Sequence, residues 1–121
     1  MSARAIDKTR HCAGMGQVRA HIDALDDILV PLLVERGGYM TQAARIKPRA
    51  EDVRDEARIE QIVQRVRARA AAEGGEPDVI EAIYRAMMEA YIAFEHREFA
   101  RLAAAGNGRD PKAQPQQETT P

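Results

Sequence analysis

Apolar residues recur at three- and four-residue steps along most of the chain, which is the spacing of one face of an α-helix. The first stretch runs from about residue 16 to 46. Its apolar positions are Val18, Ile22, Leu25, Leu29, Leu32, Leu33, Tyr39, Met40, Ala43 and Ala44. Pro31 should kink this helix because proline lacks a backbone N–H, and Gly37-Gly38 should weaken it locally. Since the apolar phase continues past both, we predict one long, kinked helix that ends before Pro48.

Two further stretches show the same spacing. The second runs from about residue 51 to 73 and stops at Gly74-Gly75, a usual helix terminator. The third begins at Pro77 and continues to about Ala105. Their apolar positions are Val53, Ala57, Ile62, Val63, Val66 and Ala70, then Ile80, Tyr84, Met87, Met88, Tyr91, Phe94 and Leu102. No strand pattern is evident, so the pattern predicts an all-α fold of three helices.

The periodic part defines the domain organisation. We expect a flexible lead-in over residues 1–14, a helical domain over 15–105, and a tail over 106–121 that is disordered by its Pro/Gln/Thr composition. A first helix over 16–46 would be roughly 45 Å long. A compact domain of this size is only about 26 Å across. An intertwined homodimer, in which the long helices pack on each other, would cover the excess length.

Composition narrows the function classes. The formal net charge is −1, which gives no overall attraction to nucleic acid or to an anionic membrane. No segment reads as a secretory signal or a membrane span, so a cytoplasmic protein is expected. The single Cys12 excludes an internal disulfide. His11, His21 and His96 lack metal-ligand spacing, so we expect no metal site.

Four charged residues stand on or beside the apolar stripes: Arg19, Arg36, Lys47 and Glu95. A buried charge is costly unless it is paired, so we expect these side chains to converge on a small anionic ligand. Arg36 and Lys47 are eleven residues apart and share one helix face. Arg19 lies about 26 Å from Arg36 along the axis. It could therefore reach the same ligand only from a partner subunit.

Other polar residues extend this candidate pocket. Asp55 and Arg58 share a face of the second helix, and Tyr91 precedes Glu95 by one turn. Arginine forks suit carboxylates, and several of them suit a dicarboxylate. Spacing alone also permits snorkelling surface cations, or a salt-bridge network in a non-catalytic helical interaction module.

Five segments in order resemble the all-helical chorismate mutase family, whose relatives include the isochorismate pyruvate lyases. They are residues 18–26, 32–36 (Leu-Leu-Val-Glu-Arg), 43–47 (Ala-Ala-Arg-Ile-Lys), 53–58 and 83–95. The resemblance covers about residues 14 to 100. It implies an isomerase of aromatic amino acid biosynthesis that works as a homodimer with two sites and without a cofactor.

The resemblance also implies residue roles. Arg36, with Arg19 from the partner subunit, would bind the two substrate carboxylates. Lys47 would donate to the ether oxygen that gains negative charge as the C–O bond breaks, and Glu95 would face the same oxygen. An ionised Glu95 would repel that oxygen, so the activity should rise towards mildly acidic pH. Arg36, Lys47 and Glu95 are therefore the expected catalytic residues.

Two positions leave the substrate open. Asp55 would lie near the ring hydroxyl through its backbone, Arg58 would add to carboxylate binding, and Tyr91 replaces a frequent Ser or Thr. Many mutases carry Glu where this chain has Ile59, whereas the lyase branch is apolar there and has a lead-in similar to that at Cys12. Asp55 fits the mutase pattern better. Chorismate mutase is the primary interpretation, and isochorismate pyruvate lyase is the alternative.

Overall fold

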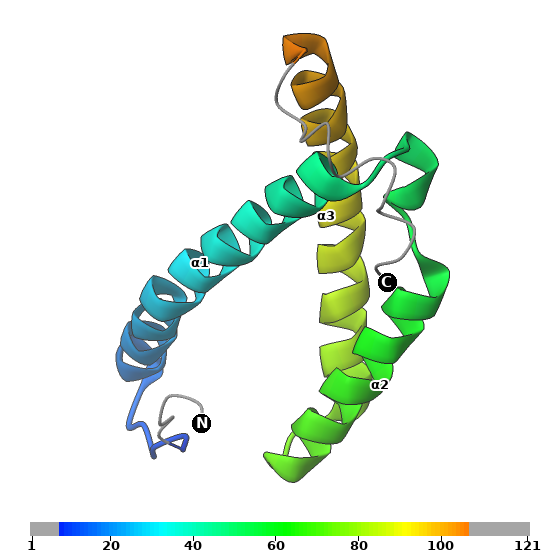
Figure 1. Cartoon of the computed structure of the whole chain (residues 1–121). Coiled ribbons are helices and arrows are strands. Elements are labelled where there is room, and N and C mark those ends of the chain that lie inside the picture. The colour runs from blue at the N-terminus through cyan, green and yellow to red at the C-terminus, as the bar shows by residue number, and fades with distance from the viewer. Residues whose placement is uncertain (1–7, 107–121) are drawn as a thin grey trace, which may run out of the picture. The chain divides into compact units, whose positions relative to one another are not determined.

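The computed structural model describes residues 8–106, which form helices joined by short turns and contain no strand (Figure 1). The helices are α1 (Met15–Ile46), the short 3-10 turn η1 (Ala50–Asp52), α2 (Glu56–Ala72) and α3 (Pro77–Ala105). The predicted all-α class is confirmed. Residues 1–7 of the expected lead-in and almost all of the expected disordered tail lie outside the described residues.

The chain divides into two compact units within α1, residues up to Glu35 and residues from Arg36 onward. In the first unit, α1 keeps Pro31 in its interior, and large apolar side chains are 49% to 70% exposed. These side chains are Met15, Ile22, Leu25, Ile28, Leu29, Val30 and Val34. A helix in water is stabilised chiefly by burying its apolar face, so this stretch is short of packing partners within its own unit.

The second helix begins later than the sequence pattern predicts. Instead of starting at residue 51 or 52, the chain makes η1, in which Val53 N–H donates to the Ala50 carbonyl at 3.0 Å. Extended backbone at Asp55 then separates η1 from α2. The Asp55 carboxylate accepts the Arg58 backbone N–H at 3.0 Å, which makes Asp55 the N-cap of α2. The apolar pattern could not reveal this boundary. Val53 directly follows η1, is buried, and continues the apolar stripe of α2 in the sequence.

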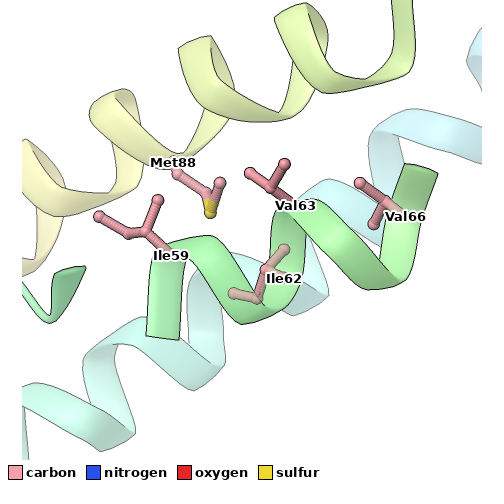
Figure 2. Packing of buried hydrophobic residues seen from close by; sticks show 5 residues of the cluster. All are labelled: Ile59, Ile62, Val63, Val66 and Met88. Carbon is pink, nitrogen blue, oxygen red and sulfur yellow. The ribbon is translucent and has the colours of Figure 1, made fainter. Parts of the chain in front are cut away.

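The core of the second unit lies between α2 and α3, which run side by side (Figure 1). Four residues at helical spacing on α2 pack against Met88 of α3, as Figure 2 shows. They are Ile59, Ile62, Val63 and Val66. This close-packed pair of helices is the scaffold of the candidate active site.

The far end of the α2–α3 pair is joined by a tight turn and by surface ion pairs. Gly74 has φ of 80°, a conformation that favours glycine, and Pro77 starts α3. Arg67 of α2 contacts Glu81 of α3 at 2.7 Å, and Arg85 of α3 contacts Glu60 of α2 at 3.1 Å. Within residues 8–106, none of the helices combines the length and the hydropathy that a bilayer crossing requires.

Candidate active site

A cavity of about 250 Å³ lies within the second unit, at the end where α1 stops and α2 starts. Six of the seven residues predicted to form the site line it: Arg36, Lys47, Asp55, Arg58, Tyr91 and Glu95. Its volume is near the lower end of the roughly 300–1,000 Å³ that is typical of small-ligand sites. The cavity therefore suits a small, compact ligand.

Arg19, the seventh residue, is not among the residues that line this cavity. It lies in the first unit, where its side chain is exposed. Its placement in the site of a partner subunit stays a prediction.

Within a single chain, the four stripe charges differ in burial. Only Glu95 is buried, with 3% of its surface exposed. The Lys47 side chain is 29% exposed, Arg36 is half-buried and Arg19 is exposed. Long cationic side chains can lay their aliphatic stems on an apolar wall while the charged end stays accessible, which a shorter carboxylate cannot do.

Lys47 and Glu95 form an ion pair across the cavity, with Nζ 2.9 Å from Oε2. The angles at this contact fall outside those of a hydrogen bond. Oε2 therefore has no hydrogen-bond partner among residues 8–106. We treat the contact as an ion pair because charge attraction depends on distance rather than on angle. A buried ion pair adds little net stability, since desolvation offsets the attraction. Its presence in a cavity wall therefore indicates a functional role more than a structural one.

The backbone beside the cavity orients Lys47. Its N–H donates to the Ala43 carbonyl at 2.9 Å and completes the last turn of α1. Its ammonium group donates to the Val53 carbonyl, 3.2 Å away. An ammonium has three donors. One donor is used on Val53, and even if the charge contact orients a second towards Glu95, the third remains for a ligand.

Asp55 and Arg58 bring the start of α2 to the cavity. Asp55 uses its carboxylate for the cap, so its charge is compensated by the backbone N–H of Arg58. The Arg58 guanidinium donates to Gln61 at 2.6 Å. Among residues 8–106, no carboxylate pairs with Arg58, which keeps its positive charge available to an anion.

Arg36 lies over the face of Tyr91, with its guanidinium carbon 5.1 Å from the ring centroid. This distance is within the range of a cation–π contact. In the part of the chain that the structure describes, Arg36 has no carboxylate partner. The rest of the wall is mainly apolar and includes Ile59, Met88 and Ile92. Two arginines without carboxylates thus face an apolar cavity, which favours an anion with a hydrophobic body.

Sequence reasoning missed two contributors to the site. The Val53 carbonyl was not anticipated because a backbone acceptor has no sequence signal and because η1 was predicted as helix. Gly37 was interpreted only as a weak point of α1. A Cβ at this position would lie 3.4 Å from Cε1 of Tyr91, so the α1 backbone at Gly37 packs close beside that ring.

A second cavity, of about 530 Å³, lies at the far end of the α2–α3 pair. Its wall is mostly apolar and includes Val66, Ile80 and Tyr84. No residue of the predicted site lines it. Within residues 8–106, no group of three or more His, Cys, Asp or Glu side chains is placed to hold a metal ion.

The charges of the first cavity suit an anion and could stabilise negative charge that develops next to Lys47. Comparison with known proteins identifies the family of the chain. A family model described as chorismate mutase type II matches residues 18–96. The matched range contains all seven predicted site residues. No curated protein matches the chain in sequence. Because the family model covers more than half of the chain, this protein belongs to the chorismate mutase type II family.

Proposed function

We propose that this chain is an isomerase that rearranges chorismate to prephenate in the cavity between α1, α2 and α3. The observation that carries the proposal is the Lys47–Glu95 pair. Glu95, with 3% of its surface exposed, places its carboxyl group 2.9 Å from the Lys47 ammonium group. The same cavity presents Arg36 and Arg58, neither of which has a carboxylate partner among residues 8–106. Membership of the family supports the same reaction.

The reaction is pericyclic and needs neither a nucleophile nor a proton relay, so the enzyme has two tasks. The first is to hold the flexible enolpyruvyl arm over the ring, which converts a rare conformer into a bound one. Arg36, with Arg19 of the partner subunit, would hold the two carboxylates for this purpose, and Arg58 would add positive charge. The apolar wall around Ile59 would exclude water from the ring.

The second task is to stabilise the ether oxygen as it gains negative charge. Lys47 would donate its third N–H to this oxygen. Its orientation is fixed in advance by the Val53 carbonyl, so little reorganisation is needed during the reaction. Glu95 would face the same oxygen and would donate a second hydrogen bond when its carboxyl group is protonated. Asp55 would lie near the ring hydroxyl through its backbone.

A homodimer in which α1 crosses to the partner would bring Arg19 to the site. The exposed apolar side chains of the first unit support this arrangement, because a second copy would remove them from water. Mixing two inactive variants tests it. In a heterodimer of Arg19→Ala and Arg36→Ala chains, one of the two sites would contain both arginines.

Unfolding and refolding an equal mixture of the two variants should therefore restore up to about a quarter of the wild-type activity, if subunits pair at random. Each variant refolded alone is the control and should stay inactive. If the mixture gains nothing although size-exclusion chromatography shows dimers, the two arginines do not act across an interface.

Isochorismate pyruvate lyase activity is the second candidate, and Ile59 in the cavity wall is the observation that favours it. That reaction is also pericyclic and needs nearly the same charges. Purified protein should be assayed side by side on chorismate and isochorismate. Prephenate without pyruvate selects the mutase, and salicylate plus pyruvate selects the lyase.

A non-catalytic helical module would convert neither substrate. It would also show no thermal shift with a dicarboxylate mimic of the transition state, whereas an enzyme with this site is stabilised by mass action.

A further inference from the structure

The stack of Arg36 on Tyr91 is a contact that the proposed chemistry does not itself require. Arg36 lies on α1 and Tyr91 on α3, and both line the cavity. The guanidinium carbon is 5.1 Å from the ring centroid. Both side chains are half-buried, so the contact is shielded from part of the solvent, which strengthens a cation–π interaction.

The backbone of α1 lies beside this stack. Gly37 directly follows Arg36, and a Cβ at Gly37 would come within 3.4 Å of the Tyr91 ring. That distance is a van der Waals contact, so the α1 backbone at Gly37 packs close beside the ring. The ring is thus held from one side by the α1 backbone while its face supports the guanidinium.

An arginine without an anionic partner has many rotamers and loses entropy when a ligand fixes it. A guanidinium stacked on a ring keeps its N–H groups in its own plane, where they can still form a two-pronged contact with a carboxylate. The aromatic face therefore restricts Arg36 without using the donors that the ligand needs.

We propose that Tyr91 is a positioning residue: it holds the Arg36 guanidinium in the orientation that receives a substrate carboxylate. This inference rests on the proposed function. Tyr91 would make no contact with the reacting atoms and would act only through Arg36. It predicts that the aromatic ring matters more than the hydroxyl group. It also predicts that the effect falls on substrate binding, since the carboxylate is held equally before and during the rearrangement.

The test compares Tyr91→Leu with Tyr91→Phe in steady-state kinetics on the substrate that the wild type converts. Tyr91→Leu should raise KM by about tenfold and change kcat by less than about threefold. Tyr91→Phe keeps the ring and should retain a KM close to that of the wild type. A matched control is Phe94→Leu, which removes the Phe94–Arg97 stack (5.8 Å) on the same helix outside the cavity. It should leave KM unchanged.

A double-mutant cycle separates positioning from packing. The cycle is measured as the affinity for a dicarboxylate mimic of the transition state, because Arg36→Ala is expected to be inactive. Tyr91→Leu should weaken this affinity about tenfold in the wild-type background but less than about twofold in an Arg36→Ala background, because the group it positions is gone. An equal loss in both backgrounds would overturn the inference and assign Tyr91 to packing. A fall in kcat with an unchanged KM would overturn it as well and place Tyr91 at the reacting atoms. If the wild type converts neither chorismate nor isochorismate, the proposed function fails and this inference fails with it.

Discussion

The second unit contains two kinds of ion pair, and they differ in burial. Lys47 and Glu95 meet in a cavity wall, where the carboxylate side chain is 4% exposed. On the outside of the α2–α3 pair, Arg85 contacts Glu81 at 2.7 Å and Glu60 at 3.1 Å, with side-chain exposures of 27% to 57%. The distances are similar, but only the first pair contains a carboxylate that is removed from water, while its partner Lys47 is 29% exposed.

The difference separates the charges to which we assign the proposed chemistry from charges on the surface. Exposed pairs on helices contribute little to stability and are easily exchanged. The buried pair is expensive to form and leaves Glu95 Oε2 without a hydrogen bond in the described chain. Such a pair adds little net stability, which is consistent with the role that we propose for it in the reaction.

Replacing Lys47 should have the largest effect on activity. Lys47→Met keeps the length of the side chain but removes the donor to the ether oxygen, so kcat/KM should fall by about 10²–10³. Arg85→Met makes the same kind of change in the surface network and should leave kcat/KM within about twofold. Steady-state kinetics of both variants checks the contrast. Equal losses would show that burial does not distinguish the two pairs.

Replacing Glu95 should also lower activity. Glu95→Ala removes the carboxyl group that meets Lys47 in the cavity wall and that would face the ether oxygen, so kcat/KM should fall by about 10². Glu95→Gln keeps the shape and can donate through its amide, so it should retain more activity than Glu95→Ala. Steady-state kinetics measures both variants. Equal losses would contradict a hydrogen-bonding role for the side chain at this position.

Asp55 lines the cavity but has its own backbone partner, so its replacement should affect stability. Asp55→Ala removes the N-cap of α2 and should lower the free energy of unfolding by about 1 kcal/mol. Asp55→Asn keeps an acceptor and should be closer to the wild type. Urea unfolding followed by circular dichroism measures both. An unchanged midpoint for Asp55→Ala would show that the cap is not needed.

The surface network should show the smallest effect, through acid sensitivity. The hydrogen bond from Arg85 lowers the pKa of Glu81 below its ordinary value of 4.5, and Arg101 does the same for the pKa of Glu98. A carboxylate with a lowered pKa stabilises the fold above its ordinary pKa, and this contribution disappears as the pH falls through the folded-state pKa. The melting temperature should therefore decline below pH 4.5, and Glu81→Gln should make the decline slightly shallower. A decline in Glu81→Gln as steep as that of the wild type would contradict a contribution from this pair.

The sequence pattern predicted the three helices well because each has a long, regular apolar stripe. The start of α2 was misplaced by about four residues. Asp55 was interpreted as a ligand-facing residue rather than as a cap, and the stripe continued through Val53 without a break. Boundaries of this kind depend on backbone hydrogen bonds, which leave only a weak trace in the sequence.

The site was predictable where side chains carry charge at helical spacing, as for Arg36, Lys47 and Glu95. The site was not predictable where it depends on a backbone carbonyl or on the close packing of a backbone segment. The Val53 carbonyl orients Lys47, and the α1 backbone at Gly37 packs beside the Tyr91 ring. Neither contribution comes from the chemistry of a side chain, so no pattern of residue types could indicate it.

The most direct test of the account is the fate of chorismate when it is incubated with the purified wild-type protein and with Lys47→Met. The account predicts that the wild type converts chorismate to prephenate far faster than the uncatalysed reaction, and that the variant loses most of this acceleration. Chorismate that disappears no faster with the wild type than in buffer would contradict it.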